Sequence, residues 1–504
     1  MCFQRIVRQS AWVVVFFVCS DLAIAQQAAN GDGTKEGETV RGLQEQLQMT
    51  QRQLAEAQDK LQQLSAVVEQ LQHQVNEISA RHAGSAVAEN SGVQQESRPA
   101  KITEDEWQLL NAQVQEQQQT KVGSASKFRL KLSGMLLLNV FGNSGVVDEI
   151  DLPRVAYEQP PAASDGSFGA SLRQSIFSLT GYGPDIGGAH TSADLQVDFF
   201  GGIPESYSGY SSGIARLRVA RMRMDWEHTS ISGGLDYLFF SPNSPTSYAT
   251  VAEPALASAG NLWTWTPTLR VEQRVNLANV LWKFEGGILD YSGYTGYYSD
   301  SRYATPGESS KQPAYAVRIS GNGYNEDHPV SFGIAGVITP QRYPGGNSVT
   351  GWGGLFDWKT PLAPHFELSG EFFAGKGLGG FGGLGLPRVQ NNGYTYLATT
   401  APALARLRSV GGWSQLKYRV NERSEFNVAA GYGGFDSLGL RNAAAFDPNL
   451  EAIAAKNESL LVNYVLKPRS DLVFSLEYRH LKTTQAADEP YSANHMGASA
   501  GFIF

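Results

Sequence analysis

Four arginines gathered in one short segment are the residues of this chain best suited to chemistry. They lie in the run ARLRVARMRMD, Ala215–Asp225, as Arg216, Arg218, Arg221 and Arg223. In a regular β-strand the first two would share one face and the last two the opposite face. If the strand crosses a bilayer, a charge that faces lipid costs roughly 2–4 kcal/mol at the midplane. We therefore expect a bulge near Val219–Ala220 that turns all four arginines toward the same side.

A second charged strand is expected over 268–275. Its polar face carries Arg270, Glu272 and Arg274. Arg173 and Arg318, on two other expected strands, could join this wall. In a narrow aqueous pore with low-dielectric walls, field lines concentrate, and a wall of arginines attracts and steers anions.

The same arginines could instead be neutralised by carboxylates and only stabilise a polar interior. The carboxylates available for such pairing are Asp194, Asp198, Asp225, Asp236 and Glu272. The residue types and the predicted faces of the strands are compatible with both anion steering and internal charge pairing.

Other chemistry is poorly represented. The eight histidines are scattered, without the spacing of paired metal ligands or of an H-E-x-x-H motif. An enzyme would have to use His190 with Ser192 and Asp194, or His480 with Glu477. The segment Gly375–Gly385 lacks the G-K-[ST] ending of a phosphate loop and is expected to be a flexible external loop. We predict no catalytic residue, no cofactor and no metal site.

The elements that must position the arginines are short alternating strands. In 193–199, for example, Ala193, Leu195 and Val197 alternate with polar residues. Sixteen such strands are expected from residue 128 to the end of the chain, near 128–140, 170–182, 190–200, 215–227, 230–240, 268–275, 279–290, 314–321, 330–339, 349–360, 365–374, 409–420, 424–433, 457–467, 470–482 and 495–504.

The links between these strands alternate between short and long, with one partial exception at the link after the ninth strand. This asymmetry is typical of outer-membrane barrels, which have short periplasmic turns and long external loops. The long link Ser241–Pro267 is the preferred candidate for a loop that folds inside and narrows the pore. A soluble β-sandwich, β-helix or propeller is the competing fold.

Both ends of the chain agree with a membrane barrel. Residues 1–25 resemble a secretory signal peptide, with a basic start, an apolar run and Ala23-Ile24-Ala25 before the expected cleavage. Both cysteines, Cys2 and Cys19, fall inside it, so the mature chain would have no disulfide. The last strand ends on Phe504.

Between these ends lies a segment with heptad periodicity. Residues 40–82 place mostly apolar residues at positions a and d through six heptads, which predicts a self-associating coiled coil. Residues 26–39 are expected to be a flexible N-terminus, and 83–126 a linker with a short helix opened by the capping-box pattern at Thr103–Glu106.

The composition fits the same fold. Glycine occurs 54 times, aromatic residues reach 11% and charged residues only 17%, and the mean hydropathy is −0.26. Alternation of lipid-facing and lumen-facing residues averages out hydropathy along each strand. The net charge of −8 argues against a nucleic-acid partner.

The whole layout resembles the trimeric outer-membrane porins, in particular the DcaP-like and phosphate-selective-porin-like group with a periplasmic N-terminal coiled coil. The resemblance rests on the heptads at 40–82, on Leu172–Phe177, Arg216–Asp225, Gly234–Phe239 with Ser241–Pro245, and Thr268–Glu272, and on Phe504. It implies a homotrimer in outer-membrane lipid and a coiled coil in the periplasm. Dense lysine clusters, expected of a phosphate channel, are absent from the sequence.

We therefore expect an all-β transmembrane barrel of about 16 antiparallel strands over 127–504, preceded by an α-helical coiled coil. Its expected function is passive diffusion of small anionic hydrophilic solutes, steered by Arg216, Arg218, Arg221, Arg223, Arg270, Arg274 and Glu272. The alternative is a structural anchor whose periplasmic rod tethers the outer membrane, with peptidoglycan as its partner.

Overall fold

The computed structural model describes residues 129–161, 164–203, 213–291, 304–323, 330–343, 348–381, 395–397, 404–435, 454–487 and 489–504. The predicted signal peptide, flexible N-terminus, coiled coil and linker helix lie outside the described residues. No helix within the described ranges has the length and apolarity needed to cross a membrane.

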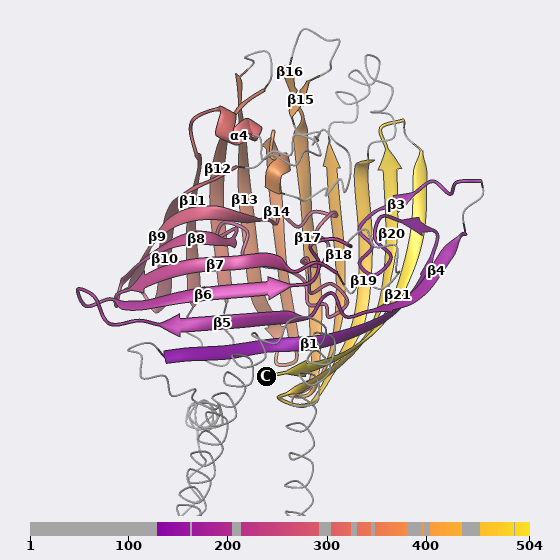
Figure 1. Ribbon diagram of the computed structural model, residues 1–504, viewed down its shortest axis with the longest axis horizontal. Helices are drawn as coiled ribbons and strands as arrows, with labels where there is room; N and C mark the ends of the chain where they lie inside the picture. The colour runs from indigo at the N-terminus through magenta and orange to yellow at the C-terminus, as the bar shows by residue number, and fades with distance from the viewer. Residues whose placement is uncertain are drawn as a thin grey trace, which may run out of the picture. The chain divides into compact units, whose positions relative to one another are not determined.

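The described chain forms one antiparallel sheet that closes on itself (Figure 1). Each strand pairs with the next one in the chain, and β1 completes the circle by pairing with the last strand, β21. The strands of this barrel are β1 (Arg129–Ser144), β4 (Gly166–Ser171), β5 (Ile176–Tyr182), β6 (His190–Asp198), β7 (Arg216–Asp225), β8 (Thr229–Tyr237), β9 (Trp265–Leu277), β10 (Val280–Leu289), β11 (Ala314–Gly323), β12 (Ser331–Arg342), β13 (Ser348–Ala363), β14 (Phe366–Lys376), β17 (Arg408–Asn421), β18 (Ser424–Phe435), β19 (Ala454–Arg469), β20 (Leu472–Gln485) and β21 (Pro490–Ile503).

Strands β4 and β5 together occupy one strand position of the barrel. Both pair with β1, at its two ends, and are separated only by the interruption Leu172–Ser175. The barrel therefore has sixteen strand positions, and all sixteen predicted strands are confirmed within a few residues of their expected bounds.

Side chains alternate between the two faces of the wall. On β13, Trp352 and Phe356 are 49% and 44% exposed and face outward, whereas Leu355 and Asp357 are 4% and 3% exposed and face inward. The terminal strand follows the same rule, with Met496 at 66% and Phe502 at 45% on the outer face. The outside is thus an apolar band and the inside a mixed polar surface, as a barrel in a bilayer requires.

The remaining small elements lie in the links. They are the hairpin β2 (Val146–Val147) and β3 (Ala156–Tyr157), helix α4 (Pro306–Ser309), the 3-10 turn η2 (Gly379–Phe381), and the hairpin β15 (Thr395–Leu397) and β16 (Leu404–Arg406).

The link between β8 and β9, residues 238–264, is folded into the barrel; we call it the inner loop. Its Ser241 hydroxyl bonds Glu371 at 2.6 Å, and its Ser247 hydroxyl bonds Glu477 at 2.6 Å, on two distant strands. Gly260 has φ +93°, and an added Cβ would lie 2.3 Å from the carbonyl oxygens of Gly412 and Tyr432. Only glycine fits there. The predicted inward-folding link is therefore present.

A second link, residues 145–161 between β1 and β4, also folds against the inner wall; we call it the inner hairpin. The Ala156 amide donates to the Thr483 hydroxyl at 2.9 Å, and Arg479 donates to the Pro153 carbonyl at 3.1 Å. This second inward segment was not predicted from the sequence.

The glycine-rich segment differs from the expected external loop in its first half. Leu378 and Phe381 are 2% and 1% exposed and pack with the inner loop, where the Phe240 and Phe381 rings lie 5.2 Å apart. The prediction was wrong for 375–381 because two apolar side chains among the glycines supply a burial site. Residues 382–385 lie outside the described residues.

Candidate pore lining

Strand β7 carries a bulge at Arg218, one residue before the predicted position. Gln196 pairs with Val219 and the adjacent Val197 pairs with Leu217, so Arg218 has no residue opposite it. The alternation shifts at that point. Leu217 and Met222 are 46% and 71% exposed on the outer face, while the four arginines of the segment all contact carboxylates of the inner wall.

The first two arginines share one carboxylate. Arg216 donates from Nε and Nη2 to the two oxygens of Asp198 at 3.1 and 2.7 Å. Arg218 lies 3.5 Å from the same group, and its guanidinium lies 5.0 Å from the Trp265 ring centroid. Asp198 is completely buried. This carboxylate compensates part of both positive charges and holds both side chains against the wall.

Arg221 bridges two further strands. Its two terminal nitrogens lie 2.7 Å from Asp194 on β6 and 2.9 Å from Asp236 on β8. The bridge ties three neighbouring strands together across their inner faces.

Glu272 on β9 is the centre of the next group. It lies 4.0 Å from Arg223, 3.4 Å from Arg270 and 3.7 Å from Arg274. Asp225 contacts Arg223 at 3.2 Å and Arg274 at 2.6 Å. The pairing that the sequence left open is therefore present for all six predicted arginines.

The row of ion pairs continues onto β10, β11 and β13. Glu285 lies 3.3 Å from Arg270 and 3.1 Å from Arg318, and Arg318 donates to both oxygens of Asp357 at 2.9 Å. Arg318 thus joins the wall, as proposed from the sequence. Asp357 also accepts a hydrogen bond of 3.0 Å from Asn243 of the inner loop.

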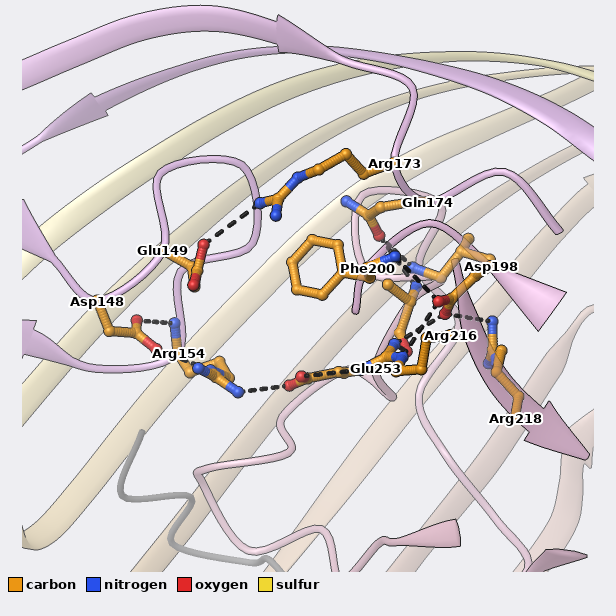
Figure 2. A network of polar contacts seen from close by, with 12 residues as sticks. Asp148, Glu149, Arg154, Arg173, Gln174, Asp198, Phe200, Arg216, Arg218 and Glu253 are labelled. Carbon is orange, nitrogen blue, oxygen red and sulfur yellow. Dashed lines mark hydrogen bonds and ion pairs between the residues drawn. The ribbon is translucent and has the colours of Figure 1, made fainter. Parts of the chain in front are cut away.

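A separate ionic network joins the inner loop to the inner hairpin (Figure 2). Arg154 of the hairpin lies 2.7 Å from Asp148 and 2.8 Å from Glu253 of the inner loop. Glu253 is also 3.8 Å from Arg216 on the barrel wall. The network thus locks two inward-folded links to each other and to β7.

Arg173 belongs to this network rather than to the arginine wall. It lies in the interruption between β4 and β5 and contacts Asp151 at 2.6 Å and Glu149 at 3.3 Å. Its guanidinium lies over the Phe200 ring at 4.2 Å (Figure 2). The neighbouring Gln174 binds the backbone of the inner loop, accepting from Val251 at 2.7 Å.

A cavity of about 500 Å³ remains on the side of the barrel formed by β7 to β13. Its six cationic lining residues are Arg221, Arg223, Arg270, Arg274, Lys283 and Arg318. Its four carboxylate lining residues are Asp236, Glu272, Glu285 and Asp357. Two further carboxylates, Asp194 and Asp225, do not line the cavity but pair with Arg221 and Arg274 at 2.7 and 2.6 Å. Arg216 and Arg218 do not line this cavity.

Sequence reasoning missed Arg154 and Lys283. Arg154 stands in a short run of charges, with Asp148 and Asp151 close by, inside a long link next to a strand. Such a run could have indicated ion pairs with the barrel interior. Lys283 lies between outward-facing residues of β10. The alternation of side chains along a strand would have been enough to place it on the inner face.

The two histidines considered for an enzyme each bind a different residue from the one expected. His190 binds Asp185 at 2.7 Å, and His480 binds Asn494 at 2.9 Å. Across the ranges that the structure describes, no cluster of three or more His, Cys, Asp or Glu residues is arranged to hold a metal ion.

No family model and no curated protein matches the sequence. Among solved structures, the outer-membrane channel DcaP of Acinetobacter baumannii superposes with a TM-score of 0.59 at 15% identity, covering 76% of this chain and 99% of that one. The anion-selective porin from Comamonas acidovorans gives 0.47 at 13% identity, with coverage of 75% and 100%. Pseudomonas putida OprB gives 0.47 at 10% identity, with coverage of 74% and 94%.

The similarity to DcaP concerns the barrel, and it confirms the resemblance expected from the sequence at the level of fold. The described part of this chain is a closed sixteen-stranded antiparallel barrel with the fold of an outer-membrane porin.

Proposed function

We propose that this protein is a passive diffusion channel of the outer membrane for small anionic hydrophilic solutes, without enzymatic activity. The observation that carries the proposal is the cavity beside the inner loop, whose lining presents six cationic and four carboxylate side chains. Because each arginine of this lining is held by carboxylates, the positive field is modest. Anions are favoured without being bound tightly, as a diffusion channel requires.

The predicted pore-lining residues fall into two groups. Arg221, Arg223, Arg270, Arg274 and Glu272 line the cavity, and we propose that they steer the solute. Arg216 and Arg218 bind the buried Asp198, and Arg216 also contacts the inner loop at Glu253.

The proposal keeps the layout expected from the sequence. Residues 1–25 would direct export, the chain would form a homotrimer in outer-membrane lipid, and the coiled coil over 40–82 would join the three protomers on the periplasmic side. A structural anchor that tethers the outer membrane to peptidoglycan is the competing function. It needs no passage through the barrel.

Conductance of the purified protein in a planar bilayer tests the proposal. We expect the current to rise in steps that come in groups of three. Under a KCl gradient, the reversal potential should have the sign that shows a preference for chloride over potassium. Folded, membrane-inserted protein that carries no current would refute the channel and favour the anchor. Current with cation preference would refute the solute class alone.

A further inference from the structure

Lys283 differs from every arginine of the cavity lining. The five lining arginines each contact one or more carboxylates within 4.0 Å. Lys283 lines the same cavity, and within the described ranges its ammonium has no ion-pair partner. The nearest acidic position on its own face is Glu285, two residues along β10. The oxygens of Glu285 are already engaged by Arg270 and Arg318.

The neighbours of Lys283 on the adjacent strand are neutral donors. Ser320 on β11 stands directly opposite Lys283 in the ladder. Asn322 follows two residues later on the same face, and it pairs in turn with Ser331 on β12. All three line the cavity. None of their side chains makes a hydrogen bond to another residue that the structure describes. On the other flank of Lys283, Arg274 is directed to Asp225 at 2.6 Å.

We propose that Lys283, Ser320, Asn322 and Ser331 form an oxyanion-binding subsite inside the cavity. This inference rests on the proposed channel function and adds the group that the passing solute would offer. An ammonium, two hydroxyls and an amide N–H₂ can all donate, and each oxygen of a carboxylate or phosphate accepts more than one hydrogen bond. No carboxylate of the described wall competes for the Lys283 ammonium. The Lys283 ammonium is therefore the positive charge of the lining that is free to act on a solute.

The test measures how an oxyanion blocks KCl current through single channels in a planar bilayer. Inorganic phosphate and acetate are added separately on one side, and the concentration that halves the current is determined for each. For the wild type we expect both to block. Lys283→Gln should weaken the block about tenfold, or about 1.4 kcal/mol. Ser331→Ala should weaken it less.

Lys359→Gln is the matched control. Lys359 is a lysine of the same barrel that lies outside the cavity lining and 3.6 Å from Glu367. It should leave the block unchanged. Block by phosphate but not by acetate, lost in Lys283→Gln, would assign the subsite to phosphate-type ions.

The failures are distinguishable. A wild-type protein that carries no current would overturn the channel itself. A conducting channel whose block is the same in wild type and Lys283→Gln would overturn the subsite while leaving the channel intact. If Lys283→Gln does not fold, as judged by heat-modifiable mobility on a gel, Ser331→Ala decides, and an unchanged block in that variant would overturn the subsite.

Discussion

The two sides of the barrel interior are polar in different ways. From β7 to β13 the inner face carries arginines and carboxylates in alternating contact, and a cavity remains in front of them. From β17 to β19 it carries three amides that bind the backbone of the inward-folded links. Gln415 accepts from the Thr246 amide at 2.6 Å, and Asn463 donates to the Thr246 carbonyl at 2.7 Å. Asn457 donates to the carbonyls of Arg154 and Ser258, both at 2.9 Å.

The difference follows from what each side faces. A buried peptide backbone needs both donors and acceptors, and a neutral amide side chain offers both without the desolvation cost of a charge. A charged pair loses much of its net benefit when it is fully desolvated, and it retains its hydration beside a water-filled passage. We infer that, between these two parts of the wall, charges mark the part that borders the open lumen and amides mark the part covered by the inward-folded links.

Replacing residues 244–260 of the inner loop by a short glycine-serine linker should have the largest effect. The amide-lined side would then lose its covering, and the single-channel conductance should rise severalfold because the cross-section widens. Planar-bilayer recordings measure this change, and heat-modifiable mobility controls for a folded barrel. A folded variant with wild-type conductance would show that the inner loop does not obstruct the passage.

Arg154→Ala should destabilise the docking of both inward links. It leaves Glu253, which is 4% exposed, with only Arg216 at 3.8 Å. Removing one member of a buried ion pair costs roughly 3–5 kcal/mol. Urea denaturation of the detergent-folded protein measures the loss, together with increased open-channel current noise.

Arg469→Ala is the matched control for Arg154→Ala. Arg469 pairs with Asp471 at 2.9 Å, but its side chain is 71% exposed. An exposed pair contributes about 0–1 kcal/mol. Equal effects of the two variants would contradict the inferred role of the Arg154–Glu253 contact.

Glu253 should make the docking of the inner loop depend on pH. Burial raises the pKa of the Glu253 carboxyl above its ordinary value, although Arg154 and Arg216 oppose the rise. In the undocked loop the carboxyl would titrate near its ordinary value. Docking therefore weakens as pH rises through the raised pKa and strengthens as pH falls through it. Open-channel current noise should decrease on acidification. In Glu253→Gln, the current noise should be low and should not depend on pH. Noise that grows on acidification in the wild type would reverse this sign.

The smallest effects are expected for single arginine changes, measured as shifts of the reversal potential under a KCl gradient. Arg223→Gln removes a charge from the cavity lining and should move the potential toward cation preference. Arg218→Gln removes a charge that does not line the cavity and is bound to Asp198, and it should move the potential less. A larger shift for Arg218→Gln would place the passage elsewhere.

Much of the barrel could be predicted because its rules are local. Period-two alternation and turn residues located all sixteen strands, and the cost of arginines facing lipid was enough to predict the bulge in β7. The inward-folding link was also found, since the predicted segment Ser241–Pro267 is long and carries polar residues such as Asn243 and Glu253.

The contents of the barrel could be predicted far less well, because they depend on contacts between residues distant in the chain. Arg154 and Glu253 are 99 residues apart, and nothing local to either specifies the other. The same holds for Gln415 and Thr246, which are 169 residues apart. Whether an arginine faces the cavity or a buried aspartate depends on the position of the inner loop. The alternation of residues along a single strand carries no information about that position.

The most direct test of the division between the two sides is cysteine accessibility during conduction. Cys2 and Cys19, the only cysteines of the chain, both fall in the predicted signal peptide, so single cysteines can be introduced into the barrel. Ser331→Cys places a thiol on the cavity lining. Ser459→Cys places one on the amide-lined side, at an inward position that is 6% exposed. We predict that a charged thiol reagent reduces the current through the Ser331→Cys channel and leaves the Ser459→Cys channel unaffected. Block at Ser459→Cys without block at Ser331→Cys would contradict the account.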